Sequence, residues 1–288
     1  MSQAESLLES RSGRDVPDTL LIGAVDYINT IPLIAGLERL ERVEVRTDVP
    51  AKQVALLEED TVDLALCSSV DLIRSQTPLR IVPVGMLGCE GPTLTVRLFS
   101  SVPIEEITRV ACDRESHTSV QLLRVLLREQ YGLSPELLHF DARRTTGAVK
   151  PPADVDALLL IGDKVVTTPV PDRFTRIEID LGEAWHELTG LPFVFATWLC
   201  RADRDEEQTD RIRRAALLLE RTRLRNAFRI DQIAAAHASA HQWPVDLAHR
   251  YLAHHLRFDL DDRARQGLAR FLELSTGFEG PLPFFGES

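Results

Sequence analysis

Small polar side chains recur in this sequence where short apolar runs give way to helices. The stretch "VDYINTIP" carries Asn29 and Thr30 directly before a proline, and "LCSSVD" carries Ser68 and Ser69 at the end of an apolar run. A carboxamide offers two donors and an acceptor, and a serine hydroxyl donates to an anion without adding charge. Ligands of open α/β sheets bind beyond the ends of strands, where backbone groups and helix N-termini are exposed. These turns therefore predict hydrogen bonding by uncharged groups to a small anion.

Two further turns have the same character. "RESHTSVQLL" places Thr118 and Ser119 at the start of a long helix, where a carboxylate can be bound without a basic side chain. "LLIGD" places Gly162, which permits close backbone approach, before Asp163 at the end of a strand. Each of these turns is equally compatible with plain helix capping or a tight bend. Taken singly, they leave both interpretations open.

Charge and composition limit the class of partner. The 288 residues include 33 basic and 44 acidic side chains, which gives a formal charge of −11. This balance argues against nucleic acid or an anionic membrane surface as the main partner. Residues 1–18 form a polar lead that we expect to be disordered, and neither a signal peptide nor a membrane span is recognisable. We therefore expect a cytoplasmic protein.

The cysteines are scattered along the chain. Cys67, Cys89, Cys112 and Cys200 show no CxxC spacing, so neither a zinc site nor a disulfide framework is indicated. We expect them to be reduced, buried packing residues.

Short apolar runs alternate with amphipathic helices, which is typical of an α/β protein with largely parallel sheets. We predict strands at "LLIGAVD", "VEVRTDV", "VDLALCS", "RIVPVGM", "TLTVRLFS", "VACD", "LLHFDA", "DALLLIGD" and "FVFATWLC". Longer helices are predicted at 120–132, 204–226, 230–240, 244–256 and 260–275. We predict two lobes, one formed by 19–102 together with 196–288 and the other by 103–195.

In this order, the motifs resemble the chorismate dehydratase family of the futalosine route to menaquinone. The resemblance runs from about residue 20 to residue 278. It is carried by "IGAVDYINTIPLIAGLE", "VDLALCSSVD", "GPTLTVRLFSSVPIEEITRVACDRESHTSVQLLRVLL", "DALLLIGD" and "DLGEAWHELTGLPFVFATW". The last segment is the most diagnostic, because its succession of acidic and aromatic residues has no generic reason to recur.

The resemblance implies a two-lobed fold similar to type II periplasmic binding proteins, with a ligand cleft between the lobes. It also implies a carbon–oxygen lyase, a hydro-lyase that removes water from chorismate to give 3-[(1-carboxyvinyl)oxy]benzoate, with no metal and no organic cofactor. The sequence shows no dinucleotide fingerprint, phosphate loop or metal cluster, which is compatible with that reaction. The oligomeric state is not predicted.

The resemblance further implies roles for individual residues. Asn29 is expected to hydrogen-bond the departing hydroxyl or a carboxylate. Thr95 keeps a catalytic hydroxyl where the family commonly has serine, and His117 stands where arginine is common, which makes the charge there pH-dependent. The expected substrate-binding residues are Ser68 and Ser69 for one carboxylate, Thr118 and Ser119 for the other, and Gly162 and Asp163. Three more residues, Asp26, Tyr27 and Trp185, either line the cleft or only pack.

The base is not evident in these turns, which offer no obvious histidine or glutamate for the task. We therefore favour a route in which the enolpyruvyl carboxylate of the substrate takes the proton.

Other classes of protein share such a cleft. An exported binding protein would normally carry a signal sequence, and a transcriptional regulator would need an N-terminal helix-turn-helix for which the first 18 residues are too short. A sister enzyme of the same pathway, which forms 1,4-dihydroxy-6-naphthoate, has a catalytic histidine in its cleft, and the "LLIGD" strand end offers none. That sister activity and a non-catalytic cytoplasmic protein that binds small anions remain the alternatives.

Overall fold

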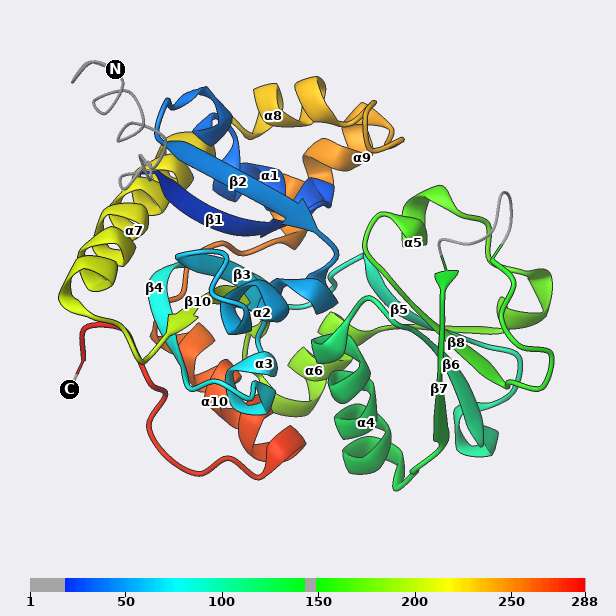
Figure 1. Cartoon of the computed structure of the whole chain (residues 1–288). Coiled ribbons are helices and arrows are strands. Elements are labelled where there is room, and N and C mark those ends of the chain that lie inside the picture. The colour runs from blue at the N-terminus through cyan, green and yellow to red at the C-terminus, as the bar shows by residue number, and fades with distance from the viewer. Residues whose placement is uncertain (1–18, 143–148, 288) are drawn as a thin grey trace, which may run out of the picture.

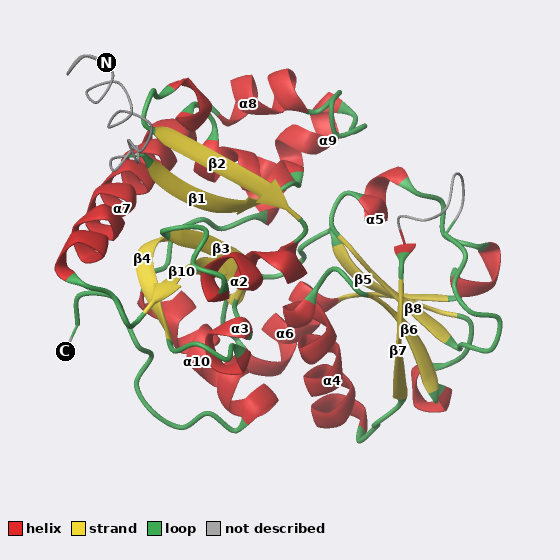
Figure 2. Ribbon diagram, in the orientation of Figure 1, coloured by secondary structure: helices red, strands yellow, loops and turns green. Residues whose placement is uncertain are grey.

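The computed structural model describes residues 19–142 and 149–287. Within these residues the chain forms two five-stranded sheets with helices packed against them (Figure 1). Helices and strands alternate along most of the sequence, as the coloured elements of Figure 2 show. The predicted α/β class is confirmed. The lead predicted at residues 1–18 lies outside the described residues.

The first sheet has the strand order β2-β1-β3-β10-β4. Its strands are β1 (Leu20–Val25), β2 (Val43–Asp48), β3 (Leu64–Ser68), β4 (Leu79–Cys89) and β10 (Phe193–Arg201). β1 runs parallel to β2 and β3, whereas β10 runs antiparallel to β3 and β4.

The second sheet has the order β7-β6-β8-β5-β9. Its strands are β5 (Val96–Ser100), β6 (Arg109–Asp113), β7 (Glu136–Phe140), β8 (Ala157–Ile161) and β9 (Ile177–Asp180). β6 runs parallel to β7 and β8, and β5 runs antiparallel to β8 and β9.

The prediction was of largely parallel sheets, and both sheets are mixed: four strands of each sheet run in one direction and the fifth runs against them. Each sheet has one strand that enters from the other sheet, β5 after β4 and β10 after β9, and this strand runs against its neighbours. β9 was not predicted: its four residues alternate apolar and acidic side chains, but four residues are the shortest run over which such a pattern indicates a strand. The bounds of the predicted lobes stay a prediction, although β5, placed there in the first lobe, pairs within the second sheet.

The helices are α1 (Ile31–Ile34), α2 (Pro50–Glu58), α3 (Asp71–Arg74), α4 (His117–Tyr131), α5 (Lys164–Thr167), α6 (Leu181–Thr189), α7 (Glu206–Ala227), α8 (Ile230–His237), α9 (Val245–Arg250) and α10 (Asp262–Thr276). α7 packs on β1 and β4, and α10 packs on β10, so both cover the first sheet. The helix predicted at 244–256 ends early, because a π-helical turn, Tyr251–His255, replaces its second half.

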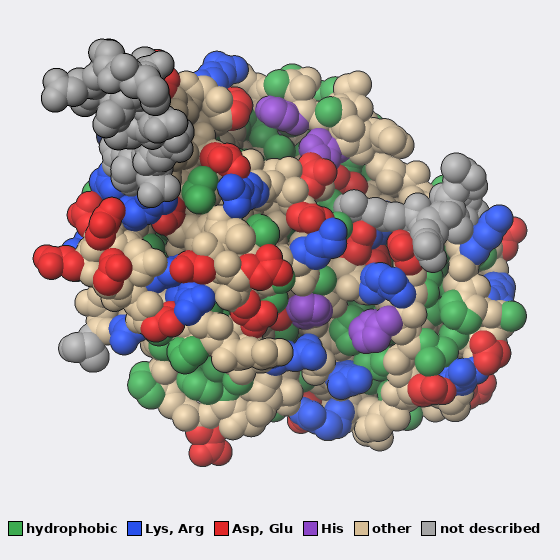
Figure 3. All heavy atoms as spheres, in the orientation of Figure 1, with side chains coloured by type: hydrophobic (Ala, Val, Ile, Leu, Met, Phe, Trp, Pro, Cys, Tyr) green, Lys and Arg blue, Asp and Glu red, His purple; other side chains and the backbone are tan. Residues whose placement is uncertain are grey.

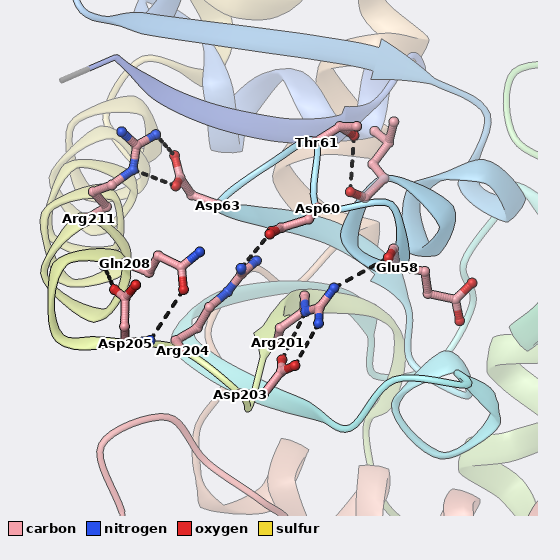
Figure 4. Close-up of polar contacts among 11 residues, drawn as sticks. Glu58, Asp60, Thr61, Asp63, Arg201, Asp203, Arg204, Asp205, Gln208 and Arg211 are labelled. Atoms are coloured by element: carbon pink, nitrogen blue, oxygen red, sulfur yellow. Dashed lines mark hydrogen bonds and ion pairs between the residues drawn. The ribbon is translucent and has the colours of Figure 1, made fainter. Parts of the chain in front are cut away.

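Polar contacts fix the start of α7 beside the first sheet (Figure 4). Asp205 caps the helix by accepting from the Gln208 backbone at 2.8 Å, and the Gln208 side chain accepts in return from the Asp205 backbone. Arg211 donates two hydrogen bonds to Asp63, at 2.8 and 2.9 Å. The helix predicted at 204–226 is present and spans Glu206–Ala227.

The core near β10 is rich in aromatic rings. Trp185 meets Phe193 and Phe271 edge to face, with ring centroids 5.3 and 6.1 Å apart, and its indole N–H donates to the Pro192 carbonyl. Trp185 is thus a packing residue and does not line the cleft. The four cysteines are free and buried, as expected, and burial raises the thiol pKa of Cys112 and Cys200 to about 12.

On the face seen in Figure 3, acidic and basic side chains are interspersed. None of the helices in the described part of the chain combines the length and apolarity that a membrane crossing requires.

Candidate active site

A cavity lies between the two sheets, and the space free of protein atoms in it and at its mouth amounts to about 520 Å³. Its apolar wall includes Val25 and Leu87 from the first sheet and Val96 and Ile161 from the second. The cavity therefore depends on both sheets. Its polar wall consists of Tyr27, Asn29, Ser68, Thr93, Thr95, Ser116, Ser119 and Tyr251. Apolar walls with a few convergent polar groups are typical of small-molecule sites.

The described lining contains no Asp, Glu, Lys, Arg or His side chain. Pro50 at the start of α2 and Ser116 at the start of α4 both lie in the wall, so two helix N-termini open onto the cavity. Such termini carry partial positive charge, although at α2 Pro50 has no N–H and the Ala51 N–H donates to the Glu115 carbonyl at 3.1 Å. An anion in this cavity would therefore meet neutral donors and helix dipoles instead of cationic side chains.

Asn29 lies in the tight turn Ile28–Thr30 that follows β1, and it is 8% exposed. Its carboxamide oxygen accepts from the Thr30 hydroxyl at 3.3 Å, and its nitrogen donates to the Tyr251 hydroxyl at 3.3 Å. A carboxamide nitrogen carries two hydrogens. One hydrogen therefore binds Tyr251, and the other is available to a ligand.

Thr95 precedes β5 and lies opposite the same tyrosine. Its hydroxyl oxygen is 2.7 Å from the Tyr251 hydroxyl, and its backbone carbonyl accepts from the Gly162 N–H at 2.8 Å. Burial, the dominant cause, raises the pKa of Tyr251, although its hydrogen bonds with Thr95 and Asn29 act in the opposite direction. The phenol is thus neutral at physiological pH.

Ser119 is held by the cap of α4. The Ser116 side chain accepts from the Ser119 backbone N–H at 3.0 Å and donates to the Ser119 hydroxyl oxygen at 2.8 Å. Since that oxygen acts as the acceptor, the hydroxyl hydrogen of Ser119 is directed elsewhere, and the side chain lines the cavity. Ser119 is therefore placed to donate to an anion at the start of the helix.

Ser69 and Thr118, both predicted to bind substrate, do not line the cavity. The Ser69 hydroxyl donates to the Val194 carbonyl at 2.7 Å and lies 3.4 Å from the Thr118 hydroxyl, which also accepts from the Val70 N–H. These contacts join the end of β3 to the start of α4. The structure thus places the pair between β3 and α4, outside the lining of the cavity.

Asp163 also faces away from the cavity. Its carboxylate accepts from the Ile28 N–H at 3.4 Å and lies 2.9 Å from Nδ1 of His241, beyond α8. The hydrogen bond to Asp163 raises the pKa of His241 above its ordinary value, and partial burial opposes this. A similar contact, 2.7 Å long, joins His117 to Asp71. Both histidines therefore link segments that are distant in the sequence.

Gly162 lines the cavity against the ring of Tyr27. Its φ is +67°, and a Cβ at this position would lie 2.8 Å from Cε2 and Cζ of that ring. The Tyr27 hydroxyl donates to Glu115, and the Lys164 ammonium also contacts Glu115 and lies 2.7 Å from Asp113. Burial raises the pKa of Asp113, and the ammonium opposes that rise. The absence of a side chain at Gly162 thus allows the Tyr27 ring to reach this buried ionic cluster.

The comparisons with known proteins agree with this architecture. A family model described as menaquinone biosynthesis matches residues 20–276. The chain belongs to this family. It is 32% identical over 267 residues to a chorismate dehydratase of Thermus thermophilus, covering 88% of this chain and 94% of that protein. The resemblance inferred from the sequence motifs is therefore confirmed.

Two further proteins are similar to this member of the menaquinone biosynthesis family, one in sequence and one in structure. A chorismate dehydratase of Campylobacter jejuni is 28% identical over 188 residues, which are 63% of this chain and 67% of that protein. The periplasmic aliphatic sulphonate binding protein SsuA of Escherichia coli superposes with a TM-score of 0.61 at 16% identity, covering 90% of this chain and 86% of that one. The predicted periplasmic-binding-protein-like fold is confirmed by this likeness.

Sequence reasoning missed Tyr251, Ser116 and Thr93 as cavity residues of this family member. Ser116 could have been found, because a serine three residues before Ser119 has the spacing of an N-cap. Tyr251 lies 222 residues from Asn29 within a helical pattern, and no local signal marks it. Among the described residues, no group of three or more His, Cys, Asp or Glu side chains is placed to hold a metal ion.

Proposed function

We propose that this protein is a chorismate dehydratase, which eliminates water from chorismate to form 3-[(1-carboxyvinyl)oxy]benzoate in menaquinone biosynthesis. The observation that carries the proposal is the cavity between the sheets, whose described wall combines one carboxamide and several hydroxyls with no charged side chain. Membership of the menaquinone biosynthesis family and the names of the two relatives support it. We also propose that the enzyme is a cytoplasmic hydro-lyase.

The substrate is already activated for this reaction. Its ring carboxylate is conjugated through a double bond to the carbon that bears the enolpyruvyl ether, so the hydrogen on that carbon is acidic. When this proton leaves, the electrons of the C–H bond move toward the ring carboxylate. They then expel the neighbouring hydroxyl, the ring becomes aromatic, and the departing oxygen leaves as water. The protein has to orient the substrate and stabilise the charge that moves.

Asn29 and Thr95 are the residues to which we assign the departing hydroxyl. Both contact the Tyr251 hydroxyl, so their side chains converge on one part of the wall. A neutral donor suits this task, because a buried cationic side chain would carry a large desolvation penalty. Asn29 and Thr95 would donate more strongly as negative charge develops on the oxygen, which lowers the barrier.

Ser68 and Ser119 are the residues to which we assign the two carboxylates. They enter the cavity from different segments, Ser68 from the end of β3 and Ser119 from the start of α4. Ser69 and Thr118 would support them by joining these two segments. A substrate that bridges the two segments would bind best when the lobes are held in this arrangement.

The proton acceptor is assigned to the substrate itself. The described wall contains no carboxylate or imidazole, and the cavity phenol of Tyr251 is protonated because its pKa is raised. The enolpyruvyl carboxylate is bound to the same ring and can fold over the acidic hydrogen. It would take that proton, which then leaves with the hydroxyl as water.

Incubation of the purified protein with chorismate tests the proposal directly. We expect loss of one water, detected by mass analysis, and a product identical to synthetic 3-[(1-carboxyvinyl)oxy]benzoate. Either compound should also stabilise the folded state, by about 2.7 kcal/mol at a hundredfold excess over its dissociation constant. No turnover, together with melting curves unchanged by either compound, would reject the function.

A further inference from the structure

We propose that Tyr251 is a positioning residue of this reaction: its hydroxyl orients the Asn29 carboxamide and the Thr95 hydroxyl so that each presents a hydrogen to the substrate. The inference rests on the proposed function and adds a residue from the C-terminal part of the chain. Three observations support it: the π-helical backbone at Tyr251, the direction of the hydrogen bonds that its hydroxyl makes, and the burial of its side chain.

The backbone around Tyr251 departs from a regular helix. α9 ends at Arg250, and the π-helical turn Tyr251–His255 follows. Such turns are rare in proteins and occur frequently at functional sites. The Tyr251 ring is 1% exposed and stacks on Trp243, with centroids 5.0 Å apart and planes inclined by 21°. The ring is therefore held firmly, and its hydroxyl lies at the polar wall of the cavity.

The hydrogen bonds of this hydroxyl have a definite direction. Asn29 donates to it at 3.3 Å, because a carboxamide nitrogen is a donor only. A buried phenol hydrogen also needs an acceptor, and the Thr95 oxygen lies 2.7 Å away. Thr95 therefore accepts from Tyr251, which leaves its own hydrogen to point elsewhere. Since Thr95 lines the cavity, that hydrogen is available to the substrate.

Tyr251 acts through these two neighbours and not as a base or acid. Burial keeps the phenol protonated, so it does not take the proton from the substrate. Its oxygen receives one hydrogen of Asn29, which fixes the plane of the amide and leaves the second hydrogen for a ligand. Both donors aimed at the departing hydroxyl thus depend on one phenol.

Tyr251→Phe removes only the oxygen and keeps the ring that packs on Trp243. We expect kcat to fall about 10-fold to 100-fold, the loss measured for outer hydrogen-bond partners of metal ligands, while KM changes little. The split follows because the misaligned donors act mainly on the departing oxygen, where charge develops in the transition state. Tyr131→Phe is the matched control, since Tyr131 is partly exposed at the end of α4 and should keep full activity.

A mutant cycle separates positioning from an independent effect. If Tyr251 acts through Asn29 and Thr95, adding Tyr251→Phe to a protein that carries both Asn29→Ala and Thr95→Val should lower kcat by much less than it lowers kcat in the wild type. Rate losses that multiply would overturn the inference, as would wild-type kcat in Tyr251→Phe.

Two controls keep this inference distinct from the proposed function. If the wild-type protein does not dehydrate chorismate, the proposed function is rejected, whatever the variant does. A crystal structure of Tyr251→Phe then tests the positioning role without a measurement of turnover. We expect altered rotamers for Asn29 and Thr95, and unchanged side-chain positions would overturn the inference.

Discussion

Asn29→Asp keeps the size of the side chain and replaces its amide donors with an anionic oxygen. In the structure the Asn29 nitrogen donates to Tyr251, and its second hydrogen is assigned to the departing hydroxyl. Aspartate would remove both donations and would bring a carboxylate into a cavity whose described wall is uncharged. Asn29→Ala removes the donors without adding charge. The two variants together therefore separate loss of a donor from repulsion of the substrate.

Removal of one preorganised donor typically lowers turnover by about 10²-fold to 10³-fold, or about 2.7 to 4 kcal/mol. We expect a loss of this size for Asn29→Ala. A new carboxylate about 4 Å from a substrate carboxylate adds repulsion of roughly 4 kcal/mol at an effective dielectric constant of 20. Asn29→Asp should therefore be the slower of the two variants and should also bind the substrate more weakly.

The assay is the rate of 3-[(1-carboxyvinyl)oxy]benzoate formation, measured beside the melting temperature of each variant. Asn226→Ala is the control, because this buried carboxamide donates to the carbonyls of Pro32 and Ala35 and has no place in the cavity wall. It should lower stability and leave kcat within a small factor. Near-normal rates in both Asn29 variants would refute the catalytic role, and a large loss of stability in Asn29→Ala would make the residue a turn cap.

The wall of the cavity and its surroundings give three further predictions. Ser119→Ala should lower kcat/KM on the order of 10-fold to 100-fold, because it removes a hydrogen bond to a charged group, and unchanged kinetics would make the residue only part of the cap. Gly162→Ala should lower kcat/KM well below that of Gly132→Ala, which has the same φ of +67° but open space around its Cβ; equal activities would contradict the close approach to the tyrosine ring. The His241 pKa is raised in the folded state, so its ion pair with Asp163 stabilises fully below about pH 6.5 and is lost as pH rises through the raised pKa. The difference in melting temperature between wild type and His241→Gln should shrink over that rise, and a constant difference would count against the pair.

Local patterns in the sequence predicted the parts of the site that local structure builds. Asn29, Ser68 and Ser119 each follow a strand or begin a helix, and the structure brings all three to the wall of one cavity. The same local signals cannot say which way a side chain turns. Ser69 and Thr118 carry the same hydroxyl in neighbouring positions, yet they point to each other between the end of β3 and the start of α4.

Long-range features of the fold determine the residue and the strand directions that local sequence patterns did not predict. Tyr251 lines the cavity at the start of a π-helical turn, and helical periodicity continued through 244–256 does not reveal such a turn. The antiparallel strands β5 and β10 have the apolar composition of buried strands, which does not report direction. Their orientation is set by where the chain passes between the sheets, and that is a property of the whole fold.

The electrostatics of the cavity suit a reaction in which negative charge shifts within the substrate toward the departing hydroxyl. The chain carries a formal charge of −11, so its overall field does not attract a dianion. Buried cationic side chains would counter this, but each would carry a large desolvation penalty. The hydroxyl of Thr95 and the amide of Asn29 avoid that penalty, and their hydrogen bonds strengthen where negative charge grows. A neutral wall fixed by Tyr251 from behind therefore favours the departing hydroxyl over the bound substrate.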